Sequence, residues 1–265
     1  MIRINKEKKR MPCEKEWEVL LKKEQRLLEK RKEKKETAFN RLLAEKVPEK
    51  LQHTLDIAFE KAFHLIFEKG TGIIEKTYQK DKLEKEFKVN LYADQIYGTR
   101  KTLRKFSQKA GQAGARNLAA SGVAGVGMGL LGIGLPDIPI FTGMILRCIY
   151  EIAINYGFNY KSESEKYFIL LLIEGAVSYG GHLEEVEHKI EGFMNNSSFP
   201  ADYVPEEQIS RTSRMLSREL LYMKFLQGIP VVGAVGGAYD AIYMKQIAVY
   251  AKLKYQKRFL IKYRK

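Results

Sequence analysis

Several features that would point to a particular chemistry are scarce in this chain of 265 residues. It has two cysteines, Cys13 and Cys148, whose spacing fits neither a zinc motif nor a disulfide framework, which is typical of a reducing compartment. The four histidines show no metal-ligand spacing. No apolar segment follows the charged first ten residues, so we expect no secretory signal and a cytoplasmic location. We therefore predict no catalytic residues, no metal site and no cofactor.

The alternation of apolar and polar residues that marks half-buried strands is also missing. Helical spacing dominates instead, so we expect an all-α fold. We divide it into a charged helical arm over residues 1–47 and a multi-helix domain over residues 48–265. The arm contains a long charged helix over residues 14–46. Two interpretations of it stay open: a solvated helix resting on the domain, or a coiled-coil arm that binds a partner.

One segment predicts the centre of the core. Ser162 and Glu165 have the spacing of a capping box, in which each residue satisfies a backbone N–H at the start of a helix. The helix that follows, over residues 166–179, is nearly continuously apolar around residues 168–173. A helix that is apolar on most sides must be surrounded by other elements, so we place this one inside the core.

The net charge of +14 is concentrated in three segments. Residues 1–50 carry a surplus of seven positive charges, while residues 95–136 and 251–265 carry six and seven cations and no acidic residue. Such clusters suit the phosphates of anionic lipids or of nucleic acid. We predict that lipid phosphates are bound by residues of the last two clusters, namely Arg100, Lys101, Arg104, Lys105, Lys252, Lys254, Lys257 and Arg258.

Charge is absent from residues 118–136, where glycine recurs every two or three residues, and residues 228–243 hold a second glycine-rich apolar run. Glycine lets helices approach backbone to backbone. Two interpretations stay open: close helix crossings in a soluble core, and shallow insertion into a membrane. The predicted helix-packing glycines are Gly125, Gly129, Gly132, Gly134, Gly233, Gly236 and Gly237.

Three acidic residues, Asp137, Glu174 and Asp240, lie in apolar surroundings in the sequence. An unpaired buried charge is costly, so each needs a partner. They form either one buried acidic site or three local pairings. In the local interpretation Asp137 caps a helix, Asp240 bonds a neighbouring helix end, and Glu174 pairs with an arginine or a lysine.

Two sets of motifs resemble signatures of the EcsC family of bacterial proteins. The first comprises Gly132–Pro139 (GIGLPDIP), Ile149–Ala153, Tyr156–Phe158 and Tyr167–Leu170, and the second comprises Gly233–Asp240 and Ala251–Tyr255. The resemblance extends from about Pro48 to Phe259. The family is named after a protein encoded beside the subunits of an ABC exporter in Gram-positive bacteria. The resemblance implies a helical, cytosol-facing bacterial protein with a transporter connection, and it transfers no catalytic residue.

These observations predict a non-enzymatic cytoplasmic protein that associates with the inner face of the membrane as an accessory of an ABC transporter. The expected partners are an anionic membrane surface and transporter subunits. Two alternatives stay open. One is a nucleic-acid-binding helical protein, and the other is an enzyme that uses the acidic site of Asp137, Glu174 and Asp240.

Overall fold

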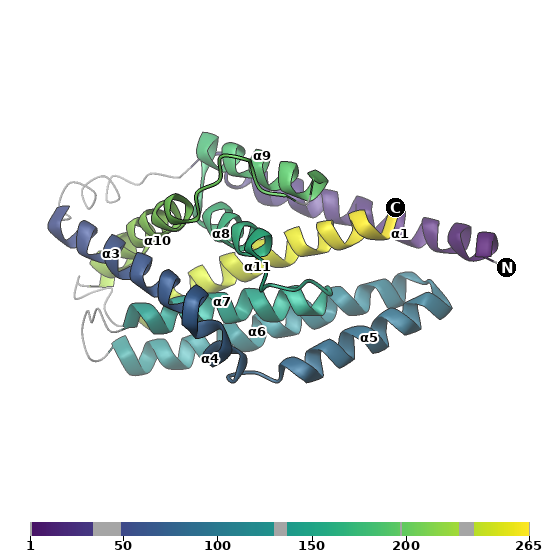
Figure 1. Cartoon of the computed structure of the whole chain (residues 1–265), viewed down its shortest axis with the longest axis horizontal. Coiled ribbons are helices and arrows are strands. Elements are labelled where there is room, and N and C mark those ends of the chain that lie inside the picture. Colours follow the sequence, from purple (N-terminus) through teal and green to yellow (C-terminus); the bar gives the residue numbers. More distant parts are fainter. Residues whose placement is uncertain (1, 34–48, 130–136, 197, 228–235, 265) are drawn as a thin grey trace.

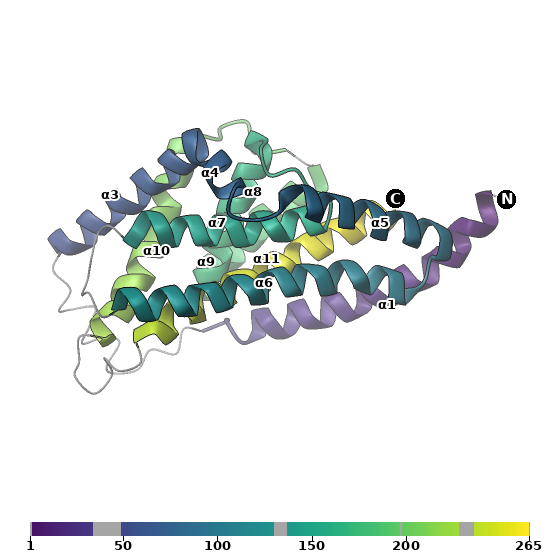
Figure 2. The same ribbon diagram turned by 90° about the horizontal axis from the view of Figure 1, so that it is seen from below.

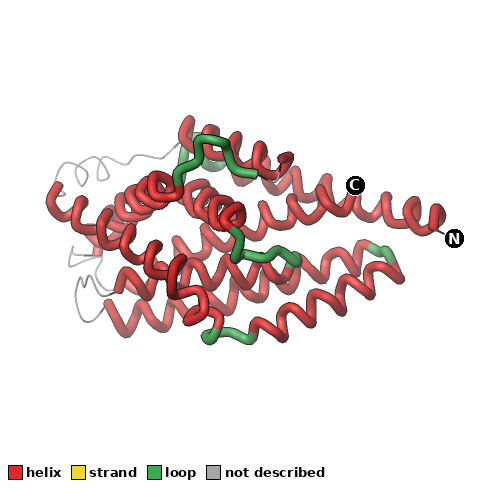
Figure 3. The backbone as a smooth tube through the Cα atoms, viewed as in Figure 1, coloured by secondary structure: helices red, strands yellow, loops and turns green. Residues whose placement is uncertain are grey.

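The all-α prediction is confirmed (Figures 1 and 3). The computed structural model describes residues 2–33, 49–129, 137–196, 198–227 and 236–264, and within these ranges there is no strand. In chain order the helices are α1 (Ile2–Glu29), α3 (Glu49–Leu65), the π-helix η1 (Ile66–Gly70), α4 (Thr71–Glu75), α5 (Lys80–Tyr97), α6 (Arg100–Gly129), α7 (Asp137–Asn155), α8 (Glu163–Val177), α9 (Gly180–Asn196), α10 (Pro205–Gln227) and α11 (Gly236–Arg264).

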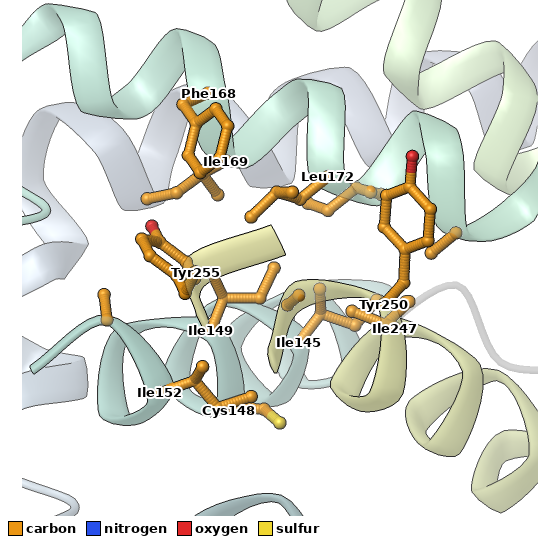
Figure 4. Close-up of a cluster of buried hydrophobic side chains, with 14 of the residues drawn as sticks. Ile145, Cys148, Ile149, Ile152, Phe168, Ile169, Leu172, Ile247, Tyr250 and Tyr255 are labelled. Atoms are coloured by element: carbon orange, nitrogen blue, oxygen red, sulfur yellow. The ribbon is translucent and has the colours of Figure 1, made fainter. Parts of the chain in front are cut away.

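Helix α8 lies in the core, as its apolar sequence predicts, and every residue from Tyr167 to Val177 is buried. It packs on α11, where the rings of Phe168 and Tyr255 meet edge to face with centroids 5.3 Å apart. Figure 4 shows Ile149 of α7 in the same cluster of buried side chains. The core therefore brings α11, from the end of the chain, together with the consecutive helices α7 and α8.

The predicted capping box is only half formed. The hydroxyl of Ser162 accepts a hydrogen bond from the backbone N–H of Glu165 at 3.2 Å, as an N-cap should. The carboxylate of Glu165 instead accepts hydrogen bonds from Tyr255 and Arg258 of α11. The local pattern predicts that the carboxylate of Glu165 caps the helix. In the fold this carboxylate instead binds the buried guanidinium of Arg258.

Helices α6 and α11 pack closely through small residues. A methyl group added at Gly114 would lie 3.3 Å from the Cβ of Ala248, and one added at Gly111 would lie 2.9 Å from Nζ of Lys252. These glycines differ from the predicted set. Gly125, Gly129, Gly236 and Gly237 lie in α6 or α11 with surroundings outside the description, and Gly132, Gly134 and Gly233 lie outside the described residues.

Helix α1 is part of the packed bundle. It lies along α6 and α11 (Figure 2), and it buries Cys13 and Leu20 completely while Trp17 is partly buried. The expected helix over residues 14–46 ends at Glu29 in this structure, and residues 34–48, with the predicted domain boundary, lie outside the described ranges. The described part of the predicted arm is therefore a core-contacting helix.

The glycine-rich end of α6 and its basic start lie at opposite ends of the bundle. Helix α6 ends and α11 begins at one end, whereas the α5–α6 turn and the C-terminus of α11 lie toward the other (Figures 1 and 2). Because a helix rises about 1.5 Å per residue, Arg100 and Gly129 are roughly 44 Å apart along α6. A membrane that receives the glycine-rich end therefore does not receive the basic residues at the start of α6.

Among the described residues, one helical segment, Ile138–Asn155 of α7, has the length and hydropathy of a membrane span. Of this segment, 72% is buried inside the bundle. A core helix of a water-soluble bundle has the same composition, so the segment alone does not establish a membrane span.

Candidate functional site

Glu174 is completely buried on α8 and faces α10. Its Oε1 accepts hydrogen bonds from Gln208 Nε2 and Thr212 Oγ1, both at 2.7 Å, and from Arg211 Nε at 3.3 Å. Its Oε2 has no hydrogen-bond partner among the described atoms. Burial raises the pKa of this carboxyl above its ordinary value, although Arg211 opposes the shift. The local interpretation, pairing with an arginine, matches this geometry.

The other two acidic candidates begin helices. Asp137 is the first residue of α7, and Asp240 lies in the second turn of α11. Both side chains lie outside the described part of the structure. A common acidic site of Asp137, Glu174 and Asp240 therefore stays a prediction.

The lipid-binding prediction requires correction for Lys254, Lys257 and Arg258. Their exposed fractions are 0%, 8% and 8%, because α1 and α8 pack against α11 and carboxylates of α9 reach it. Lys254 Nζ lies 2.5 Å from Glu24, and Lys257 Nζ lies 2.8 Å from the same carboxylate. Charges that are buried and paired in this way cannot reach a phosphate on a membrane surface.

The remaining partners of these cations come from α8 and α9. Lys254 also pairs with Glu187, Lys257 with Glu191, and Arg258 Nη1 with both oxygens of Glu165 at 2.7 Å. Burial alone raises the pKa of Glu24, but Lys254 and Lys257 outweigh it and hold that pKa below its ordinary value.

Glu24, Glu187 and Glu191 bring three carboxylate oxygens within 4.8 Å of one another, a spacing that also suits a cation. Lys254 and Lys257 lie among them and supply the positive charge. The cluster is therefore an ion-pair network that joins α1, α9 and α11.

The other five predicted phosphate ligands differ in their exposure and in their ion-pair partners. Arg100 and Arg104 both donate to the buried carboxylate of Glu16 on α1, at 2.8 and 2.9 Å. Lys252 is half-buried, and burial with the nearby Lys23 lowers its pKa. Lys101 and Lys105 are exposed and make no ion pair with any described residue.

Helix α5 presents an exposed face that the sequence analysis did not identify. Val89, Tyr92 and Ile96 follow one another at helical spacing, with exposed fractions of 67%, 67% and 53%. Lys82, Lys85 and Lys88 on the same side are exposed and make no ion pair with a described residue. We call these six residues the α5 outer face. Tyr97, at the end of the helix, is 65% exposed beside them.

The opposite side of α5 is fixed against the bundle, which leaves the outer face pointing away from the core. Phe87 contacts Phe106 of α6 with ring centroids 5.7 Å apart, and buried Asp94 accepts a hydrogen bond from Thr102. Gly98 caps the helix in the left-handed conformation, at φ 56°, so that α6 can turn back along α5.

One signal in the sequence could have revealed this face. Leu83 and Phe87 already form a core-facing stripe on α5, so Val89, Tyr92 and Ile96 are apolar residues in excess of what one face needs. A second apolar stripe on a surface helix indicates contact with a partner or a membrane.

Comparisons with known proteins identify the family of this chain. The model of the EcsC protein family matches residues 14–260. Protein EcsC of Bacillus subtilis (strain 168) is 25% identical over 250 residues, which cover 92% of each chain. No solved structure matches significantly. The family region thus includes most of α1, earlier than the expected start near Pro48. The chain belongs to the EcsC protein family.

Proposed function

We propose that this protein is a non-enzymatic, cytoplasmic protein that docks on the inner face of the membrane through the α5 outer face. The observation that carries the proposal is the exposed stripe of Val89, Tyr92 and Ile96, beside three lysines that have no ion-pair partner among the described residues. Lys101 and Lys105, at the start of α6, extend the basic surface around the turn that follows α5.

The chemistry of this face matches the boundary between head groups and acyl chains. Tyrosine and aliphatic side chains enter the outer acyl region, while lysines on the same helix remain among the head groups. Each lysine near an anionic surface contributes about 1 kcal/mol at physiological salt. Five exposed lysines and a few apolar side chains are therefore sufficient for reversible docking.

Nucleic acid is the alternative partner for a basic surface. Phosphate neutralisation explains the lysines but gives Val89 and Ile96 no role, because aliphatic side chains neither stack on bases nor bind phosphates. The membrane therefore accounts for more of the exposed residues. A gel-shift titration at several salt concentrations tests the alternative directly.

The connection with an ABC transporter rests on the family resemblance and belongs to the same proposal. A protein docked on the inner face is on the same side of the membrane as the ATPase subunits of an exporter. Chemical cross-linking in membranes, followed by identification of the linked peptides, tests whether α5 or a neighbouring helix contacts such a subunit.

Vesicle flotation tests the docking surface. Full-length protein is mixed at low salt with vesicles of phosphatidylcholine alone or with phosphatidylglycerol added. We expect flotation only with the anionic vesicles, and loss of flotation in the triple variant Lys82→Glu, Lys85→Glu, Lys88→Glu.

The matched control reverses the same number of charges on another exposed helix side, with Lys15→Glu, Lys22→Glu and Lys30→Glu around α1. This variant should still float. If both triple variants lose flotation equally, net charge alone governs binding and the α5 outer face is not the docking surface.

A further inference from the structure

A cleft lies along the N-terminal half of α5, against α6 and α7. Its inner part has a volume of about 390 Å³ and is bounded by side chains of all three helices and of residues 77–79. A more open outer part has a volume of about 1160 Å³. Both parts share the residues Tyr78, Gln79, Lys82, Glu86 and Lys109, so they form one continuous cleft.

This cleft opens beside the α5 outer face. Lys82, Lys85 and Val89 belong to that face and also line the outer part of the cleft. A molecule held in the cleft is therefore next to the surface that we assign to the membrane.

The cleft carries an excess of positive charge. It is lined by seven cations against four acids, a surplus of three: Lys76, Lys80, Lys82, Lys85, Lys109, Arg116 and Arg147 against Glu75, Asp81, Glu86 and Glu151.

Three of the four acids are already paired. Glu75 pairs with Lys80 at 2.9 Å and Glu86 with Lys109 at 2.8 Å, while Glu151 pairs with two arginines. In contrast, the ammonium groups of Lys76, Lys82 and Lys85 have no ion-pair partner among the described residues, and all three are exposed.

The inner part of the cleft is organised around Glu151, whose exposed fraction is 2%. Its Oε1 accepts a hydrogen bond from Arg147 Nε at 3.0 Å, and its Oε2 accepts one from Arg116 Nη2 at 3.4 Å. A guanidinium has five N–H donors, and each of these arginines donates one hydrogen bond to Glu151. Glu151 therefore holds two guanidinium groups at the cleft and leaves most of their donors for another acceptor.

We propose that this cleft binds a phosphate monoester or diphosphate group. Guanidinium forks and lysine ammonium groups are the side chains that recognise phosphate, and a group with at least two negative charges matches the surplus of three. The inner volume falls within the range of small-ligand sites. The proposal rests on the docking function when the phosphate belongs to a lipid head group, and a soluble phosphate compound would present the same chemistry.

Calorimetric titration with pyrophosphate tests the cleft without a membrane. Sulfate at the same ionic strength controls for screening. The variants Lys82→Gln and Arg116→Gln remove cleft cations that are exposed, and Lys88→Gln removes one lysine of α5 that does not line the cleft. We expect pyrophosphate affinity to fall at least tenfold in the first two variants and to stay unchanged in the third. Equal affinity in all variants, or no binding by the wild-type chain to pyrophosphate and to the vesicles described next, overturns the proposal.

A vesicle experiment separates the two sources of phosphate. Vesicles of equal surface charge contain either phosphatidylglycerol, a diester, or phosphatidic acid, a monoester. Preference for phosphatidic acid that is lost in Lys82→Gln and Arg116→Gln, but kept in Lys88→Gln, assigns the cleft to a lipid head group. If the protein binds pyrophosphate but not vesicles, the cleft is a site for a soluble phosphate compound and the proposed docking function is wrong. If the protein binds vesicles and all three variants weaken that binding equally, docking is supported and the proposal of a phosphate site in the cleft is wrong.

Discussion

Helices α5 and α11 both carry several lysines, and the structure places these lysines in opposite environments. On α11, Lys254 and Lys257 are buried and each lies between two carboxylates. On α5, the lysines of the outer face are exposed and have no ion-pair partner among the described residues. The density of positive charge along a chain therefore does not identify the cations that are free to bind a partner.

The difference arises from residues far away in the sequence. Residues 251–265 contain no acid, so the C-terminal cluster looks like the stronger phosphate site. The fold brings Glu24 to it from α1 and Glu187 and Glu191 from α9, because buried ammonium groups must be paired. Helix α5 has acids in its own sequence, but Glu84 and Glu86 pair with Lys80 and Lys109, which are not part of the outer face.

The largest expected effect distinguishes a buried lysine from an exposed one. Lys254→Met should lower the free energy of unfolding by about 3 to 5 kcal/mol, because it removes a buried ammonium group that pairs with both Glu24 and Glu187. Lys88→Met should change it by less than about 0.5 kcal/mol. Urea unfolding followed by circular dichroism measures both. Similar small losses in the two variants would show that the α11 network does not stabilise the fold.

The apolar half of the α5 outer face gives the next largest effect. The double variant Tyr92→Ser, Ile96→Ser should weaken partitioning onto anionic vesicles by roughly 30-fold, since burial of these side chains is worth on the order of 2 kcal/mol. Its unfolding midpoint should remain that of the wild type. The matched change Ile242→Ser, Val249→Ser on α11 also removes exposed apolar groups. Equal loss of partitioning in that control would contradict a specific role for α5.

Salt should separate the two sets of lysines. Raising the ionic strength from about 0.1 M to about 0.5 M shortens the screening length, so vesicle partitioning should fall about tenfold. The buried ion pairs are screened much less, and the unfolding midpoint should change little over the same range. Partitioning that is insensitive to salt would mean that the lysines of α5 do not contribute.

Acid should produce the smallest and most gradual change. Contacts with Tyr160, Lys80 and Lys161 outweigh burial and hold the pKa of Glu75 at about 2, and the pKa of Glu24 is also below its ordinary value of 4.5. A lowered folded-state pKa means that stability is present above pH 4.5 and is lost as the pH falls toward 2.

Thermal unfolding between pH 7 and pH 3 measures this slope, and Glu75→Gln should make it shallower. Vesicle binding through the α5 outer face should persist for as long as the protein remains folded. An unchanged slope in Glu75→Gln would assign the acid sensitivity to other carboxylates.

The sequence predicted the all-α class and the central helix because the apolar spacing that indicates them is local. The apolar run around residues 168–173 indicated a central helix, and α8 is buried on all sides. The candidate site was harder to predict. Val89 and Tyr92 form a second apolar stripe in the sequence, but the fold decides which of the two stripes of α5 is packed and which is exposed. Glu151 acquires a role only where Arg116 and Arg147 meet it.

Composition and periodicity by themselves determined that this protein is helical, strongly basic and provided with an apolar core helix, since these properties depend on residues within a few turns of one another. Only the tertiary structure decided which charges remain at the surface. Burial and pairing depend on carboxylates that arrive from distant helices, as Glu24 does for Lys254 and Lys257. No local pattern in residues 251–265 records that arrival, and for this reason Lys254, Lys257 and Arg258 lie inside the bundle while the lysines of α5 face outward.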